Sequence, residues 1–236
     1  MSKDSFKFKQ FTICQDRCAM KVGTDGTLLG AWAMNLKEKG SILDIGTGTG
    51  LIALMMAQRF PKAHIVGIDI DPKAVGQAKE NVSVSPFSER IDIVQTDIRD
   101  YVSEPFDTIV CNPPFFIDSL KCPDKQRNLA RHTQSMSYVT LMKSAYRLLD
   151  ADGIFSLIIP SDYRSRLEEE AALAGFVPSR ICSVKTTPSK APKRQLMEFK
   201  KTSVLQVNIE IGVLENSANK RSEWYQNLVK DFYLSK

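Results

Sequence analysis

The chain holds only two histidines, His64 and His132, and five cysteines that form no Cys-x-x-Cys pair. These residues are too few and too poorly spaced for a zinc site, and an odd cysteine count argues against a disulfide framework. No apolar run approaches the ~20 residues of a membrane helix. The N-terminus, Met-Ser-Lys-Asp-Ser, is charged and lacks the apolar core of a signal peptide. We therefore expect a cytoplasmic protein with reduced thiols, no metal and no membrane partner.

The net charge of +5 is unevenly distributed along the 236 residues. Residues 1–22 and 121–131 each carry a net charge of +3, and residues 179–201 carry +6, so the remainder is acidic. A single basic stretch is usually a solvated loop. Three such stretches on an acidic body suggest an anionic partner.

Short apolar strands alternate with helical patterns through most of the chain. The expected strands are 41–45, 64–69, 91–95, 107–111 and 154–159, and the expected helices are 51–59, 72–82, 137–149 and 164–174. This alternation predicts an α/β fold with a parallel, doubly wound sheet and helices on both faces.

The two ends of the chain follow another pattern. Residues 6–11 alternate as a half-exposed strand, and a final helix is expected over 223–233. Strands at 179–185 and 205–211 flank a basic, proline-bearing loop and could pair as a C-terminal antiparallel hairpin. We expect one domain over residues 1–236, with 1–24 as a basic N-terminal extension.

The fourth strand of this pattern ends in Asn112-Pro113-Pro114-Phe115. Each proline lacks an N–H and fixes its own φ, so the turn is stiff. It offers an amide side chain, a free carbonyl and an aromatic face, which together suit a planar molecule with an NH₂ group, such as adenine. Alone, Asn-Pro would be an ordinary turn opener.

A glycine-rich loop follows the first strand of the repeating part, in the order Asp44, Gly46, Gly48, Gly50. Glycines there allow a tight turn and a close backbone approach to a ligand. A dinucleotide site would need glycine at position 51, and no Gly-Lys-Ser/Thr of a nucleotide triphosphatase is present. The aspartate before the glycines suits a cationic ligand.

These residues resemble the first motif, Asp-x-Gly-x-Gly-x-Gly, of the Rossmann-like S-adenosylmethionine-dependent methyltransferases. The resemblance implies a seven-stranded, mostly parallel class I methyltransferase sheet, with Asp44 and the three glycines at the cofactor. It also implies that Asp69 holds the ribose hydroxyls and that Asp97, followed by Ile98, faces the adenine amine. Each aspartate alone would be a turn or cap residue, but all three fall at successive strand ends.

In this class, Asn-Pro-Pro-Phe/Tyr resembles the signature of enzymes that methylate an amino group on a planar system. The Asn112 oxygen and the Pro113 carbonyl would accept the two amine hydrogens, and Phe115 would stack on the base, a contact worth about 1–3 kcal/mol. Adenine N6, guanine N2 and the glutamine amide share this turn. Phe116 stands where guanine enzymes of ribosomal RNA often have His, and glutamine enzymes usually have Tyr in place of Phe115.

Adenine is therefore favoured, and three rivals remain. They are a guanine-N2 methyltransferase of ribosomal RNA, a catalytically silent RNA-binding module and a protein glutamine methyltransferase.

A narrower resemblance is to the bacterial family that methylates N6 of the adenine beside the anticodon of a valine tRNA. It rests on residues 22–32, 112–116, 130–132, 188–194 and 228–234. It implies that residues 1–24 cap the cofactor, with Thr24 and Asp25 near its methionine end. The alternative is that Asp25 only caps the helix that runs through Trp32, and the two roles are compatible.

The topology and the basic loops suggest a set of substrate contacts around the target base. Topology places the loops after the strands at the sheet edge that holds Asn112, so their cations could bind RNA phosphates. The predicted substrate-binding residues are Pro114, Phe116, Lys121, Lys125, Arg131, His132, Lys190, Lys193 and Arg194. His132 could also be structural, and the sequence does not decide the oligomeric state, although a monomer is favoured.

Overall fold

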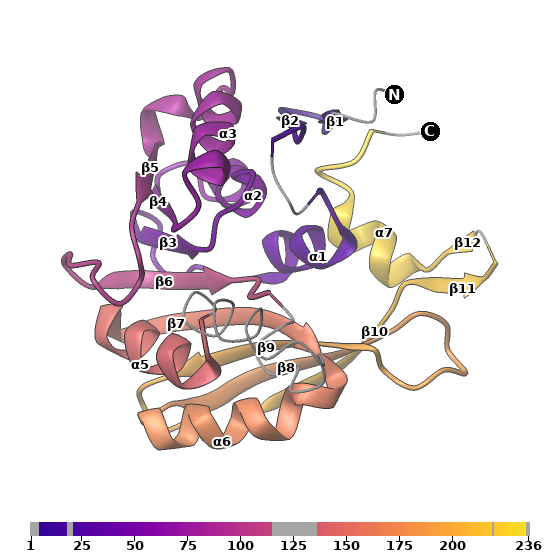
Figure 1. Cartoon of the computed structure of the whole chain (residues 1–236). Coiled ribbons are helices and arrows are strands. Elements are labelled where there is room, and N and C mark those ends of the chain that lie inside the picture. Colours follow the sequence, from indigo (N-terminus) through magenta and orange to yellow (C-terminus); the bar gives the residue numbers. More distant parts are fainter. Residues whose placement is uncertain (1–4, 18–20, 115–135, 219, 235–236) are drawn as a thin grey trace, which may run out of the picture.

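The computed structural model describes residues 5–17, 21–114, 136–218 and 220–234, and an eight-stranded sheet lies at its centre (Figure 1). In spatial order the strands are β10 (Asn208–Val213), β8 (Val177–Lys185), β9 (Arg194–Lys200), β7 (Leu149–Pro160), β6 (Phe106–Cys111), β3 (Ser41–Ile45), β4 (His64–Asp69) and β5 (Ile91–Gln95). All neighbours are parallel except β9, which is antiparallel to β7 and β8. The predicted α/β class is confirmed, and the sheet has one strand more than the seven expected.

Helices cover both faces of the sheet because successive strand residues point to opposite sides. Ile42 belongs to a core that includes residues of α1 (Thr24–Trp32), α2 (Leu51–Arg59), α3 (Pro72–Ser83) and α7 (Glu223–Val229). The next residue, Leu43, belongs to a second core, built with α5 (Tyr138–Leu148) and α6 (Arg164–Ala174). Short 3-10 helices lie at Ser88–Arg90 and Ser161–Tyr163. Among the described residues, no helix has the length and apolarity to cross a membrane.

The register brings the carboxyl ends of the parallel strands to one edge. Ile45 at the end of β3 pairs with Ile68 of β4 and with Cys111 of β6. Cys111 in turn pairs with Leu157 of β7. The glycine loop, Asp69 and Asn112 therefore follow neighbouring strand ends, as a parallel sheet requires.

The predicted C-terminal hairpin exists, but its second strand is β9 rather than residues 205–211. Strand β8 pairs antiparallel with β9 and parallel with β10. Residues 194–200 fall within the expected basic loop, and Arg194, Glu198 and Lys200 interrupt their apolar pattern. Residues 195–199 are nonetheless all buried, since the strand lies inside the sheet between two neighbours.

The predicted strand over residues 6–11 is wrong. The chain forms a hairpin of β1 (Ser5–Lys7) and β2 (Thr12–Cys14), with a turn closed by the Phe8 amide donating to the Phe11 carbonyl at 2.8 Å. Phe8 stacks on Phe11 and on Tyr233, and burial of the two phenylalanine rings favours a turn over an extended strand.

The C-terminal segment also departs from its prediction. Helix α7 ends at Val229 rather than at 233, and the Phe232 carbonyl after it accepts a hydrogen bond from the Lys9 amide at 2.8 Å. A second small hairpin, β11 (Glu215–Ser217) with β12 (Lys220–Arg221), precedes α7. The N-terminal hairpin and the end of the chain thus lie side by side (Figure 1).

Candidate active site

The glycine loop turns tightly between β3 and α2, with Gly46 and Gly48 at φ values of +69° and +57°. A side chain is strained in this left-handed region, so glycine is the favoured residue at both positions. Asp44 lies fully buried beneath the loop. Its Oδ2 accepts hydrogen bonds from Thr47 Oγ1 at 2.7 Å and from the Ala53 amide at 3.1 Å. Burial raises the pKa of the Asp44 carboxyl to about 7.

Two cavities lie at this edge of the sheet. Asp44 and Gly50, both predicted to lie at the cofactor, are not among the described residues that line them. Gly50 is the N-cap of α2 and faces α3, where a Cβ added to it would lie 3.4 Å from the Cβ of Ala78. Asp44 and Gly50 therefore support the loop on the side away from the cavities. Gly46 and Gly48 form the exposed side of the same loop and line both cavities.

The first cavity has a volume of about 260 Å³ and lies over the ends of β3, β4 and β6. The Asp69 carboxylate forms part of its wall and accepts hydrogen bonds from the amides of Gly48 and Asp71, both at 2.9 Å. Ile70 and Ile98 add apolar surface. The cavity thus combines a carboxylate, backbone of the glycine loop and apolar walls, a set that suits a nucleoside.

Asp97 also lines the first cavity, where it forms an ion pair with Arg99 that sequence reasoning did not predict. Arg99 Nε lies 2.9 Å from each carboxylate oxygen, and its backbone amide donates to Asp97 Oδ1 at 2.8 Å. The side-chain hydrogen bond from Arg99 lowers the pKa of the Asp97 carboxyl. In the sequence, only the spacing could have indicated this pair, because the side chain of an aspartate can accept a hydrogen bond from the backbone amide two residues later.

A second cavity of about 300 Å³ adjoins the first and shares Gly46, Gly48 and Asn112 with it. Thr24 and Asp25 line its other side, from the first turn of α1. The N-cap of α1 is Gly23 rather than Asp25, so the alternative role of Asp25 as a cap is wrong. Asp25 Oδ2 instead accepts a hydrogen bond from Arg194 Nε at 2.8 Å.

Asn112 follows β6 directly and stands in the wall that the two cavities share. Its side-chain oxygen is buried and has no hydrogen-bond partner among the described residues. A buried amide oxygen without a partner is costly, and a ligand N–H would remove that cost. Pro113 and Pro114 continue the wall of the first cavity, together with Met136 and with Thr140 of α5.

The basic loop between β8 and β9 lies at the same edge of the sheet, as predicted. Arg194 pairs in register with both Val184 of β8 and Pro160 at the end of β7. Lys190 and Lys193 are exposed on this loop. The remaining predicted residues of the site lie outside the described residues; they are Phe115, Phe116, Lys121, Lys125, Arg131 and His132. In the described part of the chain, no group of three or more His, Cys, Asp or Glu side chains could hold a metal ion.

The amino-acid sequence of the chain is similar to a family of known proteins. Residues 23–171 match the family model described as "Methyltransferase small domain". The chain is 50% identical over 236 residues to a tRNA1(Val) (adenine(37)-N6)-methyltransferase of Phocaeicola vulgatus, with 100% of both chains covered. Proteins of the same name from Bacteroides thetaiotaomicron and Histophilus somni are 47% and 41% identical, each over 99% of this chain and at least 98% of their own length.

The chain belongs to the tRNA1(Val) (adenine(37)-N6)-methyltransferase family. Solved structures support the fold alone. A predicted O-methyltransferase from Agrobacterium tumefaciens has a TM-score of 0.70 at 17% identity, covering 88% of this chain and 96% of its own. A TehB-like SAM-dependent methyltransferase from Corynebacterium glutamicum has a TM-score of 0.52 at 22% identity, covering 76% and 89%.

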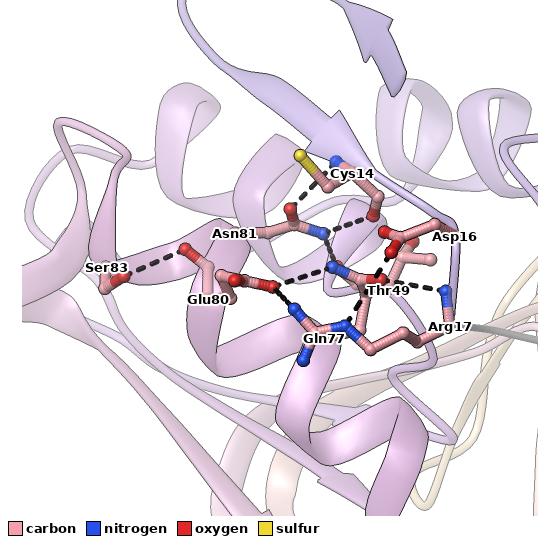
Figure 2. A network of polar contacts seen from close by, with 8 residues as sticks. All are labelled: Cys14, Asp16, Arg17, Thr49, Gln77, Glu80, Asn81 and Ser83. Carbon is pink, nitrogen blue, oxygen red and sulfur yellow. Dashed lines mark hydrogen bonds and ion pairs between the residues drawn. The ribbon is translucent and has the colours of Figure 1, made fainter. Parts of the chain in front are cut away.

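In this family member, polar contacts fasten the N-terminal segment to α3 and to the glycine loop (Figure 2). The Asn81 amide accepts from the backbone N–H of Cys14 at 2.8 Å and donates to the carbonyls of Cys14 and Thr49, both at 2.9 Å. Gln77, one turn earlier, accepts from the Arg17 amide at 3.1 Å. Sequence reasoning missed both residues, because a buried Asn or Gln on a helix gives no signal until its partners are known.

Proposed function

We infer that this chain transfers a methyl group from S-adenosylmethionine to the exocyclic N6 amine of adenine 37, next to the anticodon, in tRNA1(Val). Its relatives with that printed activity are 41–50% identical to it. The observation that supports the chemistry most directly is the buried, unpartnered side-chain oxygen of Asn112 in the wall between two cavities.

The described residues fit the cofactor along the two adjoining cavities. Asp69 would hold the ribose hydroxyls, and Asp97 and Ile98 would lie at the adenine in the first cavity. Thr24 and Asp25 would receive the amino-acid end in the second, across Gly46 and Gly48. When bound, S-adenosylmethionine supplies an electrophilic methyl group on a sulfonium centre.

The task of the protein is to make a poor nucleophile react. The lone pair of an exocyclic amine is delocalised into the ring, so the nitrogen must pyramidalise. The Asn112 side-chain oxygen and the Pro113 carbonyl would each accept one amine hydrogen and hold the nitrogen out of conjugation. Such positioning, with dipoles matched to charge developing on nitrogen, supplies much of the rate enhancement. No strong base is needed, since the amine becomes acidic as it acquires the methyl group.

The RNA partner would meet the same edge of the sheet. We propose that Lys190 and Lys193 bind phosphates of the anticodon loop, together with Lys121, Lys125 and Arg131. Pro114, Phe115, Phe116 and His132 would contact the target base, which must be splayed out to reach Asn112. Binding should weaken as salt rises, in proportion to the phosphates contacted.

We propose further that residues 1–236 act as one domain, with the segment 1–24 closing over the cofactor. The Asn81 contacts to Cys14 and Thr49 support this, as does the Val22 amide, which donates to Gln15 Oε1 at 2.7 Å. We propose a monomer, because one chain supplies both cavities and the asparagine between them. We propose a cytoplasmic location on a separate ground, the tRNA substrate named for its relatives.

The deciding experiment uses unmodified total tRNA and methyl-labelled cofactor, followed by mass spectrometry of the nucleosides. N6-methyladenosine is the expected product, and a tRNA1(Val) transcript with guanine at the target position should accept no label. N2-methylguanosine, or label in protein alone, would falsify the proposed function.

A further inference from the structure

Arg194 and Asp25 lie 169 positions apart in the sequence, yet Arg194 Nε lies 2.8 Å from Asp25 Oδ2 beside the second cavity. Their side chains are 33% and 17% exposed. We propose that Arg194 is a positioning residue, which holds Asp25 and the start of α1 against the cofactor cavity and couples that cavity to the basic loop. This inference rests on the function proposed above, because the cofactor and the tRNA are its two ligands.

The two residues are held by different parts of the fold. Arg194 begins β9, and its backbone is locked between Pro160 and Val184. Asp25 is the second residue of α1; Thr24, which begins this helix, and Lys21, just before it, line the second cavity as well. The ion pair therefore joins the rigid sheet edge to the segment that closes over the amino-acid end of the cofactor.

The side chain of the neighbouring residue, Lys193, is exposed and does not share the environment of the Arg194 side chain. Its backbone is fixed, since its amide donates to the Val184 carbonyl at 2.9 Å and its carbonyl accepts from the Ser161 amide at 3.1 Å. Its side chain is exposed, whereas that of Arg194 is turned toward Asp25. The two adjacent cations therefore have different roles: Lys193 is exposed and available to an RNA phosphate, whereas the half-buried Arg194 is paired with Asp25 at the wall of the second cavity.

The pair also predicts a link between the two binding events. A phosphate bound at the neighbouring Lys193 would draw the Arg194 guanidinium away from Asp25 without moving the fixed backbone, and a cofactor that engages Asp25 would weaken the same ion pair. Such a link is reciprocal, so bound tRNA should change the cofactor affinity by the same factor as cofactor changes the tRNA affinity.

Arg194→Gln and Lys193→Gln form a matched pair of variants that separates the two roles. Isothermal titration with S-adenosylmethionine gives the cofactor Kd, and tRNA binding over a range of salt gives the slope of log K against log salt. Arg194→Gln should raise the cofactor Kd about threefold to tenfold and leave the slope unchanged. Lys193→Gln should reduce the slope by about 0.7–0.9 and leave the cofactor Kd unchanged.

Asp25→Asn tests whether Arg194 acts through Asp25. The double variant should raise the cofactor Kd no more than the larger of the two single changes, because both break one interaction. Arg194→Lys, which keeps the charge, should recover part of the affinity and serves as the reporter if Arg194→Gln does not fold. Cofactor titrations with saturating tRNA should differ from those without it in the wild type, and the difference should shrink in Arg194→Gln.

The opposite pattern would overturn the proposal. If Arg194→Gln flattens the salt slope as Lys193→Gln does and leaves the cofactor Kd within twofold of wild type, Arg194 is a phosphate ligand. The cofactor titrations need no RNA, so they test the ion pair even if the methylated nucleoside proves to be another one.

Discussion

The Gly48 amide donates a hydrogen bond to Asp69 Oδ2 at 2.9 Å, which joins the glycine loop after β3 to the end of β4. The same carboxylate forms part of the wall of the first cavity. One side chain therefore both braces the loop and faces the place where a ribose would lie. Loss of Asp69 should damage cofactor binding through both effects.

Asp69→Asn tests this double role, because it removes the charge toward a hydroxyl and leaves a single oxygen, so that only one of the amides of Gly48 and Asp71 keeps its acceptor. Hydrogen bonds to charged groups contribute about 1.5–3 kcal/mol, so the cofactor Kd should rise about 10- to 100-fold. Calorimetric titration measures it. Asp92→Asn, on an exposed residue of β5 paired with His64, is the control and should bind like wild type. A cofactor Kd that stays at the wild-type value in Asp69→Asn would contradict the assignment.

Asn112→Ala should separate catalysis from cofactor binding. Removing a group that stabilises developing charge typically lowers kcat about 10²- to 10³-fold, and Asn112 is proposed to act on the amine rather than on the cofactor. We therefore expect single-turnover rates to fall by at least about 100-fold, while the cofactor Kd changes less than about threefold. Asn35→Ala serves as the control, since Asn35 lies near the start of β6, at the far end of that strand from Asn112. A variant within fivefold of the wild-type rate would remove Asn112 from the mechanism.

The sequence predicts correctly those site residues whose position follows from the strand order of a parallel sheet alone. Parallel strands bring their carboxyl ends together, so the sequence order of strands and loops is enough to place Gly48, Asp69 and Asn112 at one edge. Strand β9 was missed because charged residues interrupt its pattern. Asp44 and Gly50 lie behind the glycine loop rather than in the cavity walls. A motif predicts where a residue stands along the loop, but it does not predict which side of the loop the residue faces. The Asp25–Arg194 pair depends on tertiary packing across most of the chain.

Asp44 should make stability depend on pH. Burial raises the pKa of its carboxyl from 3.8 to about 7 in the folded chain. Between about pH 4 and pH 7 the unfolded chain has released a proton that the folded chain retains, so the free energy of unfolding falls as pH rises. Above about pH 7 both states are ionised and this contribution is constant.

Asp44→Asn removes that titration. Urea unfolding of both proteins should show the wild type losing stability relative to the variant by about 1.4 kcal/mol per pH unit across the window from pH 4 to 7. The difference should then level off at higher pH. Curves that stay parallel from pH 5 to pH 8 would mean that Asp44 titrates normally in the folded protein.

Asn81 should hold the N-terminal segment and the glycine loop in place together. The residue is 1% exposed, and its side chain bonds three backbone groups, two on Cys14 and one on Thr49. Asn81→Ala leaves those groups without their partner, and each buried unsatisfied group costs about 1–3 kcal/mol. We expect the free energy of unfolding to fall by about 2–4 kcal/mol. The cofactor Kd should also rise, because Thr49 belongs to the loop that lines the second cavity.

Limited proteolysis locates the effect, since residues 5–17 should be cut first in Asn81→Ala. Ser83→Ala is the control from the same helix, because Ser83 is exposed and bonds only the Glu80 carbonyl among the contacts in Figure 2. It should change stability by no more than about 0.5 kcal/mol. If Asn81→Ala loses stability but keeps both its N-terminal protection and its cofactor affinity, Asn81 is a core residue only and does not link the extension to the cofactor loop.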